Sequence, residues 1–295
     1  MLTFNISVGN HNLPTNIPYQ ITPNSRAYLD RRHIEKYSGG NNDCVIHTGY
    51  PILPFSVNAL KPNSKVSEQL LIYKELAVKL NSKYILIHLP KSSVEHTNFK
   101  AGLQLIVNQL IKNTSPAWDG TVLLEVVPLT LEMMSSISRQ YANMPYSEFL
   151  EAYFKPILEP LSKVADDRIK IVLDTAHLLA FGCKTLEDFL HTEKYLEKYL
   201  TKDVIHLNGN VAGPFMSDEH IPFIVANEKY NQIVKHFTLE NYSKLLMHIF
   251  ENYRIVVSEN NFSKYMTFTY KTYKEWANKN RIPIIPSPED SKYEL

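Results

Sequence analysis

The stretch IKIVLDTAHLLAFG, from Ile169 to Gly182, does most to decide the fold. An almost unbroken apolar run ends in Asp174, and His177 follows three residues later. Such a run is typical of a parallel strand that is covered on both faces. Its polar end has two interpretations. Asp174 or Thr175 could accept the first free N–H groups of a helix, or Asp174 and His177 could be zinc ligands.

Apolar runs of similar length recur along the chain, and segments with helix-like spacing separate them. Strands that alternate with helices predict an α/β fold, and eight such strands predict a (β/α)8 TIM barrel. A doubly wound open sheet is the competing architecture. The further runs are residues 2–8, 18–22, 44–47, 84–89, 121–127, 203–207 and 253–259, and the helix-like segments are 67–81, 97–113, 148–165, 185–200 and 239–253.

The connection between the first two runs is too short for a full helix. Only about ten residues (GNHNLPTNIP) separate them, whereas a parallel crossover normally needs a dozen or more. We therefore expect the first helix of the barrel to be shortened or missing. We expect residues 1–280 to form a single barrel domain, and the Pro-rich polar residues 281–295 to form a loose C-terminal tail.

The composition excludes several classes of protein. The chain has 295 residues, of which 44% are hydrophobic, so it can bury a sizeable core. The formal net charge is only +1, and any site for a polyanion must therefore be a local patch. Two cysteines, Cys44 and Cys183, suit a reducing compartment, the cytoplasm or the nucleus. The N-terminus does not resemble a secretory signal, and no stretch is apolar enough for a membrane span.

Polar side chains that commonly bind metals stand at or just beyond the ends of most predicted strands. The carboxyl ends of barrel strands converge on one face, which is where such enzymes have their sites. A lone histidine there is more often structural, but an acid within LLEVV or VVSEN is seldom buried without a partner. Nine such residues together predict a site for more than one metal ion. They are His47, His88, Glu125, Asp174, His177, His206, Asp218, His220 and Glu259.

This constellation resembles endonuclease IV, the zinc-dependent apurinic/apyrimidinic (AP) endonuclease family of base-excision repair. The opening stretch is similar to the family's Asp-Thr-Cys-His segment before a helix, and the resemblance runs from about residue 2 to about residue 262. No single motif is specific, but the ligand types follow one another in the family's order. The other matching motifs are HTGY (47–50), HLP (88–90), LLEVV (123–127), HLN (206–208), DEH (218–220) and SEN (258–260).

The resemblance implies a cluster of three Zn²⁺ ions per chain, with Mn²⁺ as an alternative at one position. By this resemblance the first ion is held by His47, His88 and Glu125. The second ion is held by Glu125, which bridges to the first, together with Asp174, His206 and Glu259. The third ion is held by His177, Asp218 and His220.

The implied reaction is hydrolysis of the phosphodiester 5′ to an abasic site in double-stranded DNA, leaving a 3′-hydroxyl and a 5′-deoxyribose phosphate. Removal of 3′-blocking groups, a 3′-phosphodiesterase activity, is an expected second reaction. Clustered divalent ions would neutralise the phosphate, lower the pKa of a water and stabilise the departing 3′-oxygen. Glu259 and Glu125 are the expected catalytic residues, with Glu259 orienting the water. We expect a monomer that acts on DNA and does not bind membranes.

The resemblance also implies DNA contacts. Arg26, in TPNSRAY, takes the position of an arginine that enters the damaged helix, and Tyr50 that of a tyrosine that wedges into the base stack. Asn208 is a further expected contact. A flipped abasic nucleotide has no base to unstack, which favours damaged sites. The alternatives are that Arg26 pairs with a nearby acid and that Tyr50 is a core residue.

The chain departs from the family pattern near the expected third ion. Glu219 stands where family members usually have an arginine, and the Gly-rich segment after this motif is missing. These departures predict weaker phosphate binding, whereas all nine ligand positions are retained.

Two other classes of function compete with a nuclease. A metal-dependent sugar isomerase or epimerase of the same fold would use Glu125, Asp174, His206 and Glu259 and leave the remaining ligands without a role. A non-enzymatic protein on a decayed barrel would have lost ligands, and the sequence retains all of them.

Overall fold

The computed structural model describes residues 2–6, 12–13, 15–16, 18–24, 26–113, 115–128, 144–164, 166–210, 220–222, 232–259, 275 and 278–279. The chain divides into two compact units. We call Ile6–Ile171 the N-terminal unit, and Met1–Asn5 together with Val172–Leu295 the C-terminal unit.

Parallel strands form the centre of the N-terminal unit. Their order is β3, β5, β6, β7 and β8, and Tyr19 of β3 pairs with Cys44 of β5. Most of their side chains are fully buried, as expected for strands covered on both faces. The predicted runs therefore form strands, with the same bounds for residues 44–47 and slightly shorter bounds for the others. These are β3 (Tyr19–Ile21), β5 (Cys44–His47), β6 (Tyr84–His88), β7 (Thr121–Glu125) and β8 (Ile169–Val172).

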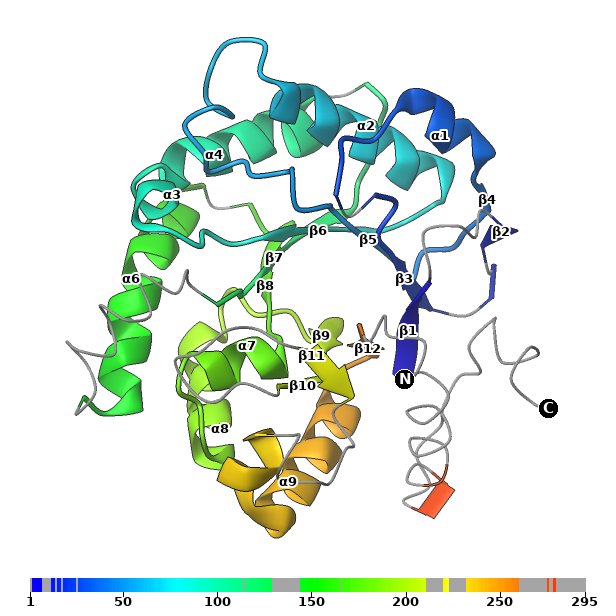
Figure 1. The fold of residues 1–295 in the computed structure, drawn as a ribbon. Coiled ribbons are helices and arrows are strands. Elements are labelled where there is room, and N and C mark those ends of the chain that lie inside the picture. Colours follow the sequence, from blue (N-terminus) through cyan, green and yellow to red (C-terminus); the bar gives the residue numbers. More distant parts are fainter. Residues whose placement is uncertain are drawn as a thin grey trace. The chain divides into compact units, whose positions relative to one another are not determined.

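The helices of this unit cover the convex side of the curved sheet, where α2, α4 and α6 lie (Figure 1). The Ser64 side chain accepts a hydrogen bond from Ser67 N and so starts α2. An apolar stripe at helical spacing, from Phe149 to Leu161, is buried on α6. The helices are α1 (Arg31–Lys36), α2 (Lys65–Lys79), α3 (Ser93–Thr97), α4 (Phe99–Ile106), the π-helix η1 (Val107–Lys112) and α6 (Tyr146–Val164). Two short strands of this unit, β2 (Asn12–Leu13) and β4 (Ser38–Gly39), pair with each other.

Three parallel strands form the sheet of the C-terminal unit. These are β1 (Leu2–Ile6), β12 (Ile255–Ser258) and β9 (Val204–His206), in that order. Leu2 pairs with Val256, so the first residues of the chain lie beside one of its late strands. On the side of β9 that faces away from β12, the strand pairs with the residues that follow β8. There His206 N donates to Leu173 O at 2.9 Å.

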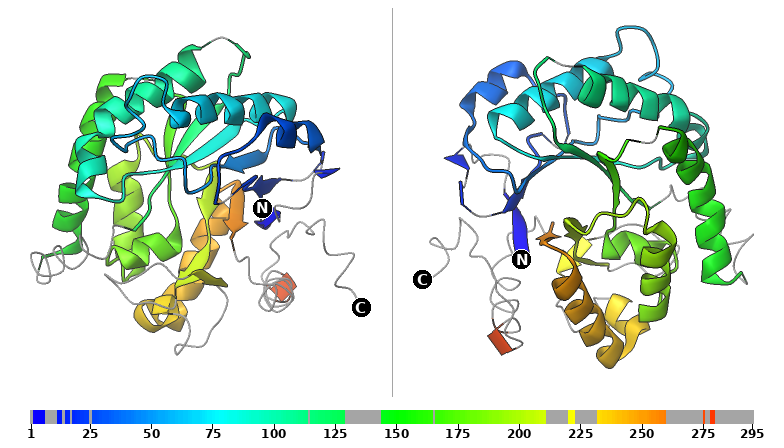
Figure 2. Two further views of the ribbon diagram at one scale, coloured as in Figure 1. Left: turned by 45° about the horizontal axis from the view of Figure 1, so that its top comes forward. Right: turned by 180° about the vertical axis from the view of Figure 1, so that it is seen from behind.

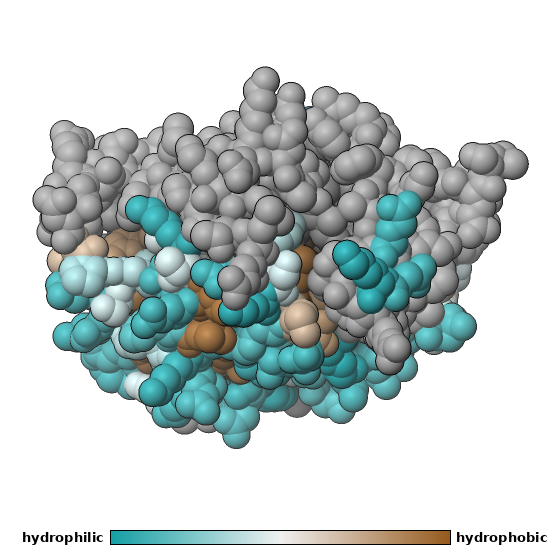
Figure 3. Space-filling view, turned by 90° about the horizontal axis from the view of Figure 1, so that it is seen from below, coloured by the Kyte–Doolittle hydropathy of each residue, from teal (hydrophilic) through white to brown (hydrophobic). Residues whose placement is uncertain are grey.

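Helices α7 (Thr175–Ala180), α8 (Leu186–Leu196) and α9 (Gln232–Asn252) belong to this unit. Figure 2 shows α8 and α9 beside each other. A short antiparallel hairpin of β10 (Asn208–Asn210) and β11 (His220–Pro222) follows β9 and was not predicted from the sequence. In the view of Figure 3, hydrophilic side chains predominate among the described surface residues, with small hydrophobic areas between them.

The eight predicted apolar runs all form strands, each in the parallel sheet of its own unit. Between β1 and β3, the residues that the structure describes contain no helix, in agreement with the short first connection. Within the described ranges, no helix combines the length and apolar character needed to cross a bilayer. The single-domain expectation for residues 1–280 stays a prediction, and residues 281–295 lie outside the described part of the chain.

Candidate metal centre

A group of three predicted ligands meets in the N-terminal unit. His47, His88 and Glu125 are the last residues of β5, β6 and β7, which are neighbouring parallel strands. Strand pairing therefore brings their side chains together. The Nε2 atoms of His47 and His88 lie 3.2 Å and 3.3 Å from the same oxygen, Oε2 of Glu125. Glu125 is completely buried, so this carboxylate has no bulk water to stabilise its charge.

The neutral form of His88 and the hydrogen bonding of His47 suit metal binding. Burial lowers the pKa of His88 to about 4, although Glu125 acts in the opposite direction, so this imidazole is neutral at neutral pH. His47 Nδ1 lies 2.7 Å from the carbonyl oxygen of Thr48. A proton on Nδ1 satisfies that carbonyl and leaves Nε2 with a lone pair directed at the cluster. Two imidazole nitrogens and a carboxylate oxygen form a donor set that fits Zn²⁺.

In the C-terminal unit, the two carboxylate oxygens of Asp174 have different roles. Oδ1 accepts hydrogen bonds from Ala176 N at 2.7 Å and His177 N at 3.1 Å, so Asp174 is the N-cap of α7. Oδ2 lies 3.6 Å from Nδ1 of His206 and 3.9 Å from Nε2 of His220. The helix-cap interpretation is therefore confirmed, and the second oxygen still faces the histidines.

Other predicted ligands surround this oxygen. Nδ1 of His206 lies 3.2 Å from Oε2 of Glu259, and the Nε2 atoms of His177 and His220 lie 3.1 Å apart. His206 and His177 are buried, whereas Glu259 and His220 retain some exposure. This ligand group is thus largely buried, with Glu259 and His220 partly exposed.

These distances place the possible ligand atoms close enough to share ions. The atoms of His47, His88 and Glu125 lie within 4.8 Å of one another, and so do those of Asp174, His177 and His220. Asp174, His206 and Glu259 meet the same limit. The groups contain nitrogen and carboxylate oxygen donors and no thiol, a combination that divalent zinc accepts. Asp218, the other expected ligand of the third ion, lies outside the described residues.

Asn208 and Thr175 hold the ligands in place. Asn208 is fully buried, and its Nδ2 donates to Asp174 Oδ2 at 2.6 Å and to Glu259 Oε2 at 3.4 Å. Its Oδ1 accepts from Glu259 N at 2.9 Å. Thr175 Oγ1 fixes the backbone of Asn208, donating to its carbonyl at 2.6 Å and accepting from its N–H at 2.9 Å. The amide of Asn208 is thus directed at the two carboxylates, and the DNA contact expected of Asn208 stays a prediction.

A sequence signal for this arrangement was available. Residues 206, 208 and 210 are polar at a spacing of two, which places them on one face of an extended chain. His206, Asn208 and Asn210 are all fully buried. Buried polar residues at that spacing indicate internal hydrogen bonds, because each needs a hydrogen-bond partner.

The two surface residues expected to contact DNA are exposed. Tyr50 is 62% exposed, so the alternative that it belongs to the core is wrong. Its ring centroid lies 5.9 Å from that of His88. Arg26 is exposed in a turn that Asn24 Oδ1 stabilises by accepting from Arg26 N and Ala27 N. The described residues include no acid that pairs with the Arg26 side chain, so the ion-pair alternative gains no support. DNA contact by both residues stays a prediction.

A second polar network in the C-terminal unit, centred on the buried Glu193, lies outside the ligand groups. Oε1 of Glu193 accepts from Lys202 Nζ at 2.5 Å and from Tyr253 OH at 2.6 Å, and Oε2 lies 2.8 Å from His248 Nε2. Burial raises the pKa of Glu193, but these hydrogen bonds outweigh it and hold the pKa below its ordinary value. The network joins Glu193 on α8 to His248 on α9 and to Tyr253, the residue that follows α9.

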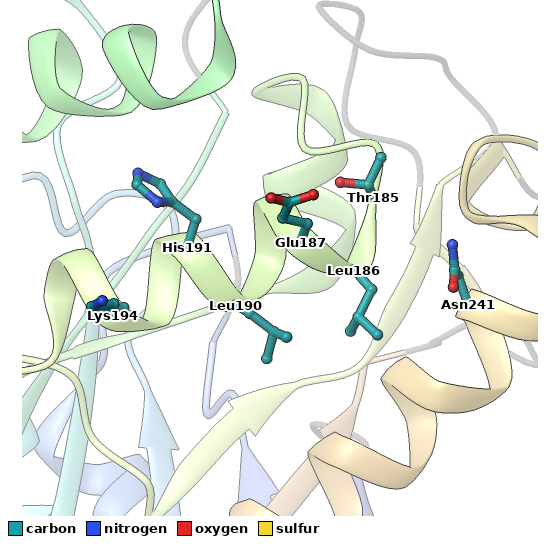
Figure 4. A pocket seen from close by; sticks show the side chains of 7 residues that line it. All are labelled: Thr185, Leu186, Glu187, Leu190, His191, Lys194 and Asn241. Atoms are coloured by element: carbon teal, nitrogen blue, oxygen red, sulfur yellow. The ribbon is translucent and has the colours of Figure 1, made fainter.

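An open pocket of about 620 Å³ lies beside α8 and α9. Figure 4 shows that most of its lining comes from α8 and that Asn241 comes from α9. None of the groups of potential metal ligands among the described residues lies there. The lining residues are Thr185, Leu186, Glu187, Leu190, His191, Lys194 and Asn241.

Parallel strands with outer helices and ligand groups at the strand ends define the class of this chain: an α/β protein with the fold of the (β/α)8 barrels. Neither a family model nor a curated protein matches the sequence. Solved structures do match. One designated AsfvAP:AG has a TM-score of 0.61 at 15% identity and covers 90% of this chain and 85% of its own.

Two other solved structures show the same fold. Endonuclease IV from Thermus thermophilus matches with a TM-score of 0.51 at 15% identity, over 94% of this chain and 99% of its own. A D-tagatose 3-epimerase-like protein matches with a TM-score of 0.54 at 17% identity, over 90% and 91%. These likenesses confirm the predicted barrel over the competing doubly wound sheet. Since the identities are low, they establish the fold and leave the function open.

Proposed function

We propose that this protein is a metal-dependent AP endonuclease. It hydrolyses the phosphodiester 5′ to an abasic site in double-stranded DNA, acts as a monomer, and leaves a 3′-hydroxyl and a 5′-deoxyribose phosphate. Removal of 3′-blocking groups is its second activity. The observation that carries the proposal is that ligand groups exist beyond the one set that a sugar isomerase would use.

The additional groups are hard to explain in an isomerase. His47 and His88 converge on one buried oxygen of Glu125, and His177 faces His220 at 3.1 Å. An isomerase of this fold would leave these nitrogens without a metal ion to bind. In a nuclease with three Zn²⁺ ions, or Mn²⁺ at one position, these nitrogens are ligands. When bound, such ions would neutralise the phosphate and lower the pKa of a nearby water.

The residues of the chain have separate roles in this proposal. Glu125 is fully buried and holds the two histidines of its group. Glu259 is partly exposed, so it can hold a water that attacks the phosphate, and Asn208 fixes its orientation through Glu259 N. Tyr50 is exposed beside His88, where it can enter the base stack, and Arg26 is a second DNA contact.

The test is incision of a duplex that carries a single abasic-site analogue, with and without prolonged chelation, together with metal analysis of the protein. We expect chelator-sensitive incision on the 5′ side and roughly three zinc ions per chain. Glu259→Gln should abolish incision and leave the fold intact. Glu251→Gln, on the exposed surface of α9, is the matched control and should retain full activity. Normal incision by Glu259→Gln would contradict the assigned role.

A metal-dependent sugar isomerase or epimerase is the second candidate function. The similarity to a D-tagatose 3-epimerase-like protein favours it, as does the Asp174, His206 and Glu259 set. It predicts one or two metal ions per chain, no incision of abasic DNA and interconversion of ketohexoses. An assay with ketohexoses on the same metal-loaded preparation separates the two functions.

A further inference from the structure

An aromatic ring and a lysine form a pair beside the ligand group of the N-terminal unit. Tyr50 follows β5 and Lys91 follows β6, the strands that end in His47 and His88. Lys91 Nζ lies 5.1 Å from the centroid of the Tyr50 ring, and that ring lies 5.9 Å from the ring of His88. The pair is therefore adjacent to the candidate metal centre and accessible from solvent.

The loop that carries Tyr50 is firmly packed. Gly49 N donates to Tyr73 OH at 3.1 Å, and Ile52 and Phe55 are almost completely buried. Phe55 packs against α4, where a Cβ added at Gly102 would lie only 2.5 Å from its ring. The exposure of Tyr50 is therefore imposed by a well-anchored backbone. An exposed aromatic ring held in this way is ready to bind without ordering cost.

The backbone at Lys91 is also fixed. Its N–H donates to Glu95 Oε2 at 2.7 Å, and Leu89 N donates to the carbonyl oxygen of Glu125 at 2.8 Å. Among the described residues, no carboxylate lies within ion-pair distance of Lys91 Nζ. The ammonium group has three N–H donors, and contact with one aromatic face leaves donors available. A cation that has no acidic partner among the described residues and lies next to predicted zinc ligands is suited to an anionic ligand.

We propose that Lys91 is a substrate-binding residue whose ammonium group contacts a phosphate of the DNA strand at the abasic site. This inference rests on the proposed nuclease function. The contact between Lys91 and the Tyr50 ring couples the two residues. Lys91 neutralises a phosphate of the DNA backbone while the Tyr50 ring occupies the base stack. The ammonium is a point charge, so it recognises the phosphodiester without reading base sequence.

The test is equilibrium binding of the metal-loaded protein to a duplex with a non-hydrolysable abasic-site analogue, measured over a range of salt concentrations. Each phosphate contact contributes about −0.9 to the slope of log K against log salt. Lys91→Gln should make the slope less negative by about 0.9 and weaken binding roughly tenfold at low salt. Lys91→Arg should retain the slope. Lys100→Gln, an exposed lysine on α4, is the matched control and should behave as wild type.

The outcomes separate this inference from the proposed function. If wild type binds and incises abasic DNA but Lys91→Gln keeps the wild-type slope and affinity, the inference is overturned and the nuclease stands. If wild type neither binds nor incises abasic DNA, the proposed function fails first. If Lys91→Arg loses as much affinity as Lys91→Gln while both keep the wild-type urea midpoint, the point-charge contact is wrong.

Discussion

Replacing Asn208 by alanine tests whether a buried amide orients the metal ligands. The change removes the 2.6 Å bond to the Asp174 carboxylate and the 2.9 Å bond from Glu259 N. A hydrogen bond to a charged group contributes about 1.5–3 kcal/mol and a neutral one about 1 kcal/mol. The free energy of unfolding of the metal-free protein should therefore fall by about 3 kcal/mol. Loss of a group that orients ligands should also reduce zinc affinity about 10- to 100-fold.

The assay has two readouts and a matched control. Urea unfolding of the chelated protein gives the stability, and competition with a zinc-binding dye gives the metal affinity. Asn210→Ala is the control, because Asn210 is equally buried on β10 but its Nδ2 donates to the backbone oxygen of Ala176 at 3.3 Å. That variant should lose about 1 kcal/mol of stability and keep its zinc affinity within about threefold.

Two results would refute this reasoning. If Asn208→Ala and Asn210→Ala bind zinc equally well, the amide does not orient the carboxylates. If Asn208→Ala binds zinc normally but loses affinity for abasic DNA, the original expectation of a DNA contact is the better description.

Three other changes have clear expected outcomes. Gly102→Ala should lower the urea midpoint by an amount equivalent to about 1–3 kcal/mol, because the added Cβ would lie 2.5 Å from the ring of Phe55. An unchanged midpoint would contradict the close packing of Gly102 against Phe55. In the folded protein the pKa of Glu193 lies below its ordinary 4.5, so the stability that its carboxylate contributes is present above pH 4.5 and is lost as the pH falls through the folded-state pKa. Glu193→Gln should remove this acid dependence from the urea midpoint. Tyr50→Ala should weaken binding to abasic duplex more than to undamaged duplex at constant stability, and equal loss on both would argue against a wedge.

The sequence predicted the strands well because their signal is local. Each buried parallel strand is an apolar run bounded by polar residues, and the pattern survives wherever the strand is covered on both faces. The hairpin of β10 and β11 has no such pattern. Asn208–Asn210 reads as a turn, and its pairing with His220–Pro222 depends on contacts that are remote in sequence.

The sequence could predict the part of the candidate site whose ligands end neighbouring strands, because strand pairing alone brings those side chains together. His47, His88 and Glu125 end neighbouring strands, so their meeting follows from the order of the sheet. The role of Asn208 and the position of Lys91 over a tyrosine ring could not be predicted in this way. Both depend on side-chain directions in loops and hairpins, which the spacing of residues does not determine.

The pairing of β1 with β12 has a consequence for synthesis of the chain. Leu2 leaves the ribosome about 250 residues before its partner Val256. At about 5–20 residues per second, β1 waits roughly 13–50 s for that partner, while Ile6–Ile171 has long been available to fold. The sheet of the C-terminal unit therefore cannot assemble until Ile255–Ser258 have been synthesised. A fusion that restrains the first five residues should delay acquisition of the native state more than an equivalent fusion at the other end.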